Sequence, residues 1–209
     1  MIDCPTRCFI LTGPIGSGKT SALRACVARL AQGGGRVAAV AQPDLGRGSD
    51  RGAFGFQMEL IAGQGEKLVR ERFPLARSLG EGEAPPPGRL CLGHFVFEAG
   101  AFERAFEFIR EAASARPPLD ALGLDEMGAL ELEGGGGLFP ALGLALDAAR
   151  LPGGPLLLLA AKERLAKRLR GLAEGRGLPC ALISPPSVDA LFEMDGFLPI
   201  NLTAGRETE

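Results

Sequence analysis

The chain is poor in the residues that build metal centres. Its 209 residues include one histidine, His94, and five scattered cysteines, an odd number. The only closely spaced cysteines, Cys4 and Cys8, do not assemble a zinc-binding set with that histidine. We therefore expect reduced, mostly buried thiols rather than a zinc site. His94 lacks a partner at metal spacing and an orienting group for base catalysis, so we do not expect it to be catalytic.

Long apolar runs and an excess of charge are also missing. The longest clear apolar run, residues 156–161, is far shorter than the ~20 residues that cross a bilayer. The first residues lack the charged and apolar blocks of a secretory signal. A formal net charge of −2 gives no global field that attracts nucleic acid or anionic lipid. These absences predict a cytoplasmic protein with neither nucleic acid nor membrane among its partners.

Glycine and proline, by contrast, are abundant, with 31 and 16 residues respectively. The glycines cluster between apolar segments, which is typical of turns rather than of disorder. The length suits one α/β domain with a sizeable hydrophobic core, whereas it is short for two full domains. We therefore expect one domain over residues 1–209, with a frayed tail at about 201–209.

Residues 13–20 carry the strongest functional signal, because they read G-P-I-G-S-G-K-T and match G-x-x-x-x-G-K-[ST] completely. An apolar strand precedes the motif and a helical pattern over residues 17–32 follows it, as a phosphate loop requires. Its glycines let successive N–H groups turn inward around phosphate oxygens, and the helix adds its positive end. The predicted nucleotide-binding residues are Gly13, Pro14, Ile15, Gly16, Ser17, Gly18, Lys19, Thr20 and Ser21.

Catalysis needs a second group of residues beside this loop. We expect Lys19 to reach the β- and γ-phosphates as a catalytic residue, and the Thr20 hydroxyl to ligate Mg²⁺. The apolar segment 119–126 ends in Asp125 and Glu126. Asp125 would hold the metal through water from a neighbouring strand, and Glu126 would polarise the attacking water as a general base. Asp44, which also follows a short strand, is the main competitor of Asp125, and Asp120 is another.

Periodicity predicts an α/β fold with three layers and a mostly parallel sheet. An antiparallel hairpin is inserted at about 53–72, where Phe54, Phe56, Met58 and Leu60 alternate with polar residues or glycine and should face the core. A long irregular connection is expected over 73–90. Arg24 lies off the apolar stripe of the first helix and should be solvated. Strands are expected at 7–12, 36–41, 119–126, 155–161 and 178–183, and helices at 17–32, 100–115, 138–150 and 162–174.

The segment 122–132, L-G-L-D-E-M-G-A-L-E-L, resembles the D-E-I-G-x-M-E-L signature of the small cancer-related and thermophile nucleoside triphosphatases. The phosphate loop and the pair Gly55-Phe56 also match that family. The resemblance implies a RecA-like variation of the P-loop fold and Mg²⁺-dependent hydrolysis of the γ-phosphate of ATP, GTP and other nucleoside triphosphates. Glu131 matches the family's second acidic position. The chain departs from the pattern at 41–44, at Ala53 and at 187–188.

Two other functions remain open at this stage. A small-molecule or nucleotide kinase would share the phosphate loop and close an arginine-rich lid, for which Arg164, Arg168 and Arg170 are available. A nucleotide-dependent switch or accessory factor could use the connection 73–90 to contact a partner protein. Candidates for an arginine finger are Arg47, Arg51 and Arg164, and the oligomeric state is open.

Overall fold

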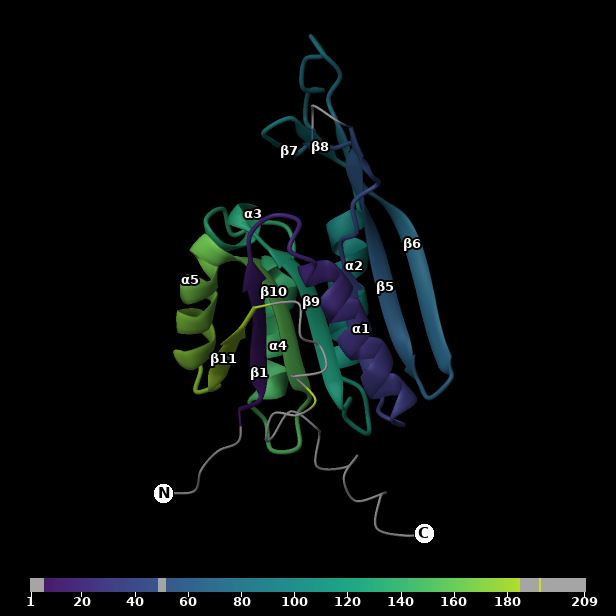
Figure 1. Ribbon diagram of the computed structural model, residues 1–209, viewed down its shortest axis with the longest axis vertical. Helices are drawn as coiled ribbons and strands as arrows, with labels where there is room; N and C mark the ends of the chain where they lie inside the picture. The colour runs from purple at the N-terminus through teal and green to yellow at the C-terminus, as the bar shows by residue number, and fades with distance from the viewer. Residues whose placement is uncertain (1–5, 49–51, 185–191, 193–209) are drawn as a thin grey trace.

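A computed structural model describes residues 6–48, 52–184 and 192 (Figure 1). Within these residues, one mixed sheet has the strand order β11-β1-β10-β9-β2-β5-β6-β8-β7, and β3 pairs separately with β4. The strands are β1 (Cys8–Gly13), β2 (Val37–Ala41), β3 (Arg47–Gly48), β4 (Gly52–Ala53), β5 (Gly55–Gln64), β6 (Lys67–Ser78), β7 (Cys91–Leu92), β8 (Phe95–Phe97), β9 (Ala121–Met127), β10 (Leu156–Lys162) and β11 (Cys180–Ile183).

The five strands from β11 to β2 are parallel, and helices cover both of their faces. One face packs on α1 (Lys19–Gln32), whose predicted apolar stripe is buried. The other face packs on α2 (Ala101–Ala113), α4 (Phe139–Ala149) and α5 (Glu163–Glu174), and the short α3 (Ala129–Leu132) follows β9. These strands are apolar along nearly their whole length because neither face meets water. The three-layer α/β architecture agrees with the prediction.

The antiparallel half of the sheet is longer than the sequence pattern predicted. β5 runs antiparallel to β2, and β6 continues to Ser78 through residues expected to be irregular. Residues 73–77 of this extension pair with β5, and its last three residues also pair with β8, in the register Ala76↔Phe97 and Ser78↔Phe95. Phe54 was expected in the core but lies in a bend before β5 and is 59% exposed.

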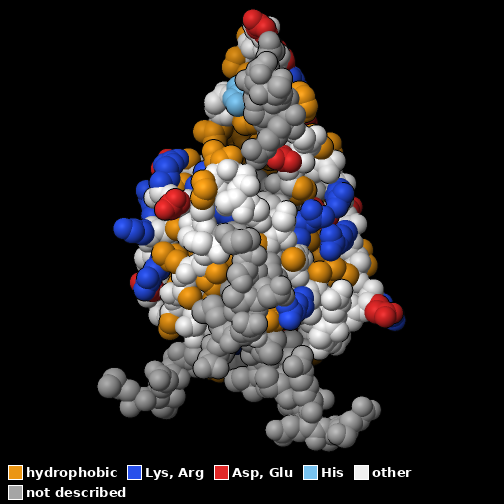
Figure 2. Space-filling model, viewed as in Figure 1, with side chains coloured by type: hydrophobic (Ala, Val, Ile, Leu, Met, Phe, Trp, Pro, Cys, Tyr) orange, Lys and Arg blue, Asp and Glu red, His pale blue; other side chains and the backbone are white. Residues whose placement is uncertain are grey.

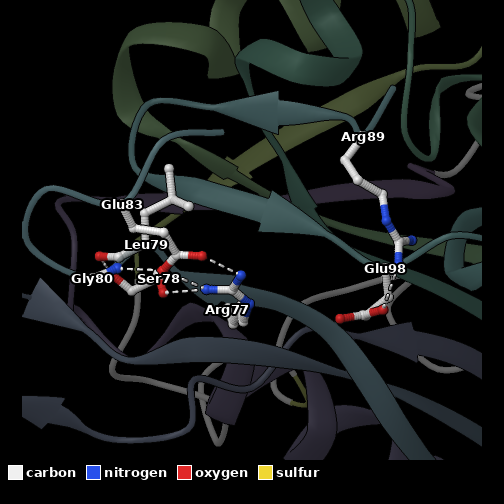
Figure 3. Close-up of polar contacts among 7 residues, drawn as sticks. All are labelled: Arg77, Ser78, Leu79, Gly80, Glu83, Arg89 and Glu98. Carbon is white, nitrogen blue, oxygen red and sulfur yellow. Dashed lines mark hydrogen bonds and ion pairs between the residues drawn. The ribbon is translucent and has the colours of Figure 1, made fainter. Parts of the chain in front are cut away.

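Residues 77–98, here named the projection, rise beyond the carboxyl edge of the parallel strands (Figure 1). Arg77 pairs with Glu83, with 2.9 Å between Nη1 and Oε2, and the Gly80 N–H donates to the same carboxylate at 2.8 Å (Figure 3). Arg89 forms a second ion pair within the projection, at 3.9 Å from Glu98 (Figure 3). These contacts tie the projection to itself at several points.

Two further properties bear on the expectations from composition. Cys8, Cys26 and Cys180 are buried free thiols and Cys91 is half-buried, whereas Cys4 lies outside the described residues, as do the tail 201–209 and residues 187–188. Among the residues that the structure describes, no helix is long and apolar enough to cross a membrane.

Candidate active site

The phosphate loop joins β1 to α1 and owes its shape to two left-handed glycines. Gly16 has φ 78° and Gly18 has φ 85°, a region that a residue with a side chain rarely adopts. Gly18 is also the residue before the first helical turn, so α1 begins at Lys19 rather than at Ser17. Ser17 N–H donates to the Pro14 carbonyl at 3.2 Å and closes the turn. The loop therefore bends back over the positive end of α1.

Lys19 is only 6% exposed, an unusual position for a lysine. Its Nζ donates to the carbonyl of Gly13 at 3.0 Å and to that of Pro14 at 2.8 Å. The ammonium group is thus held against the loop itself and at the end of β1. A buried cation whose partners are neutral carbonyls would bind an anion in their place, because an anion is a stronger hydrogen-bond acceptor.

Asp125 ends the apolar part of β9 and is fully buried. It accepts hydrogen bonds from Gln42 N–H at 3.0 Å and Glu126 N–H at 2.9 Å, and its carboxylate also bonds the Thr20 side chain. Burial raises the pKa of Asp125 to about 6, although these hydrogen bonds oppose the shift. We expected Asp125 on a strand adjacent to β1. Instead, β10 lies between β1 and β9, the strand that carries Asp125. The side chain nevertheless reaches Thr20 from there.

Glu126 is adjacent to Asp125 in the chain, but its backbone is strained and its side chain lies in different surroundings. It has φ 55°, the only positive value among non-glycine residues in the described part of the chain. This conformation separates the two adjacent acids, since Asp125 is buried against Thr20 whereas Glu126 is 29% exposed. The Glu126 carboxylate lies 3.3 Å from Nζ of Lys162, the last residue of β10. Strain of this kind is typical of functional sites.

Glu131 supports the turn that follows Glu126. Its buried carboxylate accepts the N–H of Gly128 at 3.0 Å and that of Leu138 at 3.3 Å. Burial raises the pKa of Glu131, against the effect of these hydrogen bonds. The two bonds tie the end of β9 to the start of α4. Glu131 therefore orders the chain that follows Glu126, a role that its position in the sequence did not reveal.

Lys19, Thr20 and Glu126 line one cavity of about 700 Å³ at the carboxyl edge of the parallel strands, named the phosphate cavity here, whereas Asp125 and Glu131 are buried behind its lining. Another cavity of about 610 Å³ lies at the opposite end of β2, beside α2, and includes none of the predicted site residues. The phosphate cavity is lined by Ile15, Gly16, Gly18, Lys19, Thr20, Ser21, Arg24, Gln42, Pro43, Asp44, Phe56, His94, Phe95, Glu126 and Lys162.

The chain matches the model of a known protein family. A family model described as NTPase matches residues 8–136, which include the phosphate loop, both adjacent acids and Glu131. The chain belongs to the NTPase family. This confirms the resemblance stated above and, at the level of the family, the prediction of a nucleoside-triphosphate phosphohydrolase.

The fold of the NTPase is similar to a solved structure. The solution structure of a human cancer-related nucleoside triphosphatase matches it with a TM-score of 0.58 and 22% sequence identity, covering 98% of this chain and 99% of that one. At this identity the likeness bears on the fold, and it confirms the predicted P-loop architecture. No curated protein matches the chain.

The competing carboxylates of the NTPase lie in different places. Asp44 lines the phosphate cavity, whereas the buried Asp125 interacts with Thr20. Asp120 lies at the other end of β9, where it accepts the N–H of Arg36 at 2.8 Å. Asp120 is therefore a structural residue.

The candidate arginines of α5 do not line the phosphate cavity, but Arg164 lines a separate cavity of about 440 Å³ together with Gly13, Pro14 and Ile15 of the phosphate loop. Arg164 is exposed on α5 and pairs with Glu133 at 2.7 Å. Arg170 pairs with Glu174 along the same helix, and Arg168 is exposed there too. Arg47 belongs to β3, and Arg51 lies outside the described residues. Arg168 and Arg170 thus lie on a solvated helix face, whereas Arg164 lies beside the phosphate loop.

An arginine expected in solvent lines the phosphate cavity instead. Arg24, one helical turn after Thr20, has Nε 2.8 Å from Glu59, whose side chain is fully buried. Arg72 lies 2.7 Å from the same carboxylate, and Arg70 lies 3.9 Å away. The prediction for Arg24 was wrong because helical periodicity does not show that β5 places an acid opposite it. Lys162 was missed similarly, although it is the first charged residue after an apolar strand, the signal that identified Asp125.

Proposed function

We propose that the protein is a Mg²⁺-dependent nucleoside triphosphatase that hydrolyses the γ-phosphate of ATP, GTP and other nucleoside triphosphates, with Glu126 as general base. The observation that carries this proposal is the position of Glu126. Its carboxylate enters the same cavity as Lys19 on a strained backbone and is partly exposed, so a water molecule has access to it. An acid placed in this way suits activation of water.

The triphosphate would bind along residues 13–21. Backbone N–H groups of the loop and the first turn of α1 would donate to its oxygens. Lys19 would exchange the carbonyls of Gly13 and Pro14 for β- and γ-phosphate oxygens, because an anion is the stronger acceptor. On binding, Lys19 would no longer donate to these carbonyls, and its positive charge would lie beside the bond that breaks.

The side chains next to Lys19 fit a magnesium ion. Thr20 and Asp125 bring a hydroxyl and a carboxylate together, and hard oxygen ligands are those that Mg²⁺ prefers. The raised pKa of Asp125 also indicates a buried anion that a cation would stabilise. We assign Thr20 as a direct ligand and Asp125 as a ligand through water. When bound, the ion would neutralise charge on the phosphate oxygens.

Lys162 adds a positive charge on the other side of Glu126. The ion pair orients the carboxylate of Glu126. Lys162 also stands in register with Gly13 at the end of β1. It would therefore lie beside the developing negative charge of the transferred phosphoryl group.

The proposal is tested by phosphate release from ATP, GTP, CTP and UTP, with Mg²⁺ or with a chelator, and with or without nucleoside monophosphates. We expect Mg²⁺-dependent release from several triphosphates that monophosphates do not change. Little release alone, with rapid triphosphate consumption once one monophosphate is added, would identify a kinase and contradict the proposal. Lys19→Ala should weaken both triphosphate binding and release.

A further inference from the structure

Part of the phosphate cavity is lined by aromatic side chains that have no role in the proposed hydrolysis. Phe56 of β5, His94 and Phe95 of the projection line it. The ring centroids of Phe56 and Phe95 lie 5.0 Å apart, and those of His94 and Phe95 lie 4.1 Å apart. These three rings form a continuous row, here named the aromatic wall. The projection thereby contributes to the same cavity as the phosphate loop.

The aromatic wall is not simply part of the core. Phe56 and Phe95 are half-buried, packing against the core while also lining the cavity, and His94 is exposed. Figure 2 shows hydrophobic side chains gathered below the tip of the molecule, next to its pale-blue histidine. Covering water-exposed aromatic surface with a planar ligand lowers the free energy, because that surface is removed from water.

The aromatic wall is also held in place without a ligand. Phe95 pairs with Ser78 in the sheet, and the carbonyl of His94 accepts the N–H of Leu79 at 2.7 Å. The ion pair between Arg77 and Glu83 lies directly beside this connection (Figure 3). A ligand would therefore meet rings that are already ordered, which lowers the entropy lost on binding.

We propose that the aromatic wall binds a nucleobase by stacking. The proposal rests on the proposed function, because it is the shared cavity with the phosphate loop that makes a nucleotide the matching ligand. The base is either that of the bound triphosphate or that of a second nucleoside, and the chemistry of the contact is the same. Stacking uses a π-face that every base has, so this site would tolerate several bases.

The test compares ligands with and without a base by equilibrium dialysis in the presence of a chelator, so that Mg²⁺-dependent hydrolysis does not consume ATP. Dissociation constants are measured for ATP, for inorganic tripolyphosphate, and for AMP in the presence of tripolyphosphate. The variants are His94→Ala, Phe95→Leu and the control Phe54→Ala, an exposed phenylalanine that does not line the cavity. His94 is exposed, so its variant tests the proposal even if Phe95→Leu fails to fold.

If the base belongs to the triphosphate, the ratio of the ATP and tripolyphosphate dissociation constants should rise roughly 5- to 150-fold, the usual effect of one stacked base. If it belongs to a second nucleoside, AMP binding should weaken by a similar factor while that ratio stays constant. The proposal is overturned if neither quantity differs from that of Phe54→Ala. Failure of hydrolysis with altered ATP or AMP binding would instead reject the proposed function alone.

Discussion

The ammonium group of Lys162 lies 3.3 Å from the carboxylate of Glu126 and links the ends of β10 and β9. Because β10 lies between β1 and β9, Lys162 stands between the phosphate loop and the pair of acids. The sequence predicted this lysine as the first residue of a helix over 162–174. Its position instead makes it the third charged group of the proposed catalytic centre, beside Lys19 and Glu126.

We predict that Lys162→Met lowers kcat for ATP roughly 10- to 10³-fold, in the range for removing one group that stabilises developing charge. The loss has two sources, a free Glu126 carboxylate and one positive charge fewer beside the phosphates. Steady-state phosphate release measures it. Lys167→Met is the matched control, because Lys167 is exposed on α5. Equal rates for the two variants would remove Lys162 from the mechanism.

Glu59 should be important for stability. Glu59→Gln removes the charge of a fully buried carboxylate that lies 2.8 Å from Arg24 and 2.7 Å from Arg72. We expect a loss of roughly 2–4 kcal/mol in the free energy of unfolding, toward the low end for a broken buried pair because the arginines are partly exposed. Glu71, on the same hairpin, forms an exposed ion pair with Arg104 of α2, and Glu71→Gln should cost less than about 1 kcal/mol. Chemical denaturation measures both, and equal losses would contradict the prediction.

Asp125 should make the stability of the metal-free protein depend on pH. Its pKa of about 6 lies above the value of ~3.9 expected in the unfolded chain, so the folded protein binds this proton more tightly. The associated stability is present at low pH and is lost as the pH rises through about 6. Between pH 4.5 and 7.5 the wild type should lose about 2 kcal/mol relative to Asp125→Ala.

Denaturant titrations of wild type and Asp125→Ala in the presence of a chelator measure this difference. The variant leaves the N–H groups of Gln42 and Glu126 without this acceptor at every pH, so that cost is constant. The substitution should therefore cost more at pH 4.5 than at pH 7.5. A constant or reversed difference would show that burial does not govern the pKa of Asp125.

Local patterns in the sequence were enough for much of the site. The glycines of residues 13–20 permit one loop shape, and the apolar run before Asp125 predicts a strand whose end faces the loop. The parallel sheet and the stripe of α1 follow from the same periodicities. These features depend on residues close together in the chain, which is why they could be predicted.

The features that were missed depend on distant segments. Glu59 is buried because the register of β5 against β6 places it beside Arg72, and α1 brings Arg24 from the other side. The strand at residues 73–78 pairs with β5 on one side and, over its last three residues, with β8, almost 20 residues further along the chain. His94 lines the phosphate cavity only because the projection rises from the edge where β1 ends. No local pattern records such pairings.

The central claim is that Glu126 activates the attacking water, and the most direct measurement is phosphate release from Mg²⁺-ATP by Glu126→Gln, together with its ATP affinity. We predict a loss of turnover of roughly 10²–10⁴-fold, the usual contribution of a general base, with ATP affinity retained. Glu133→Gln, which changes an exposed acid on the same connection, is the control and should retain turnover. Turnover of Glu126→Gln equal to that of Glu133→Gln would contradict the account.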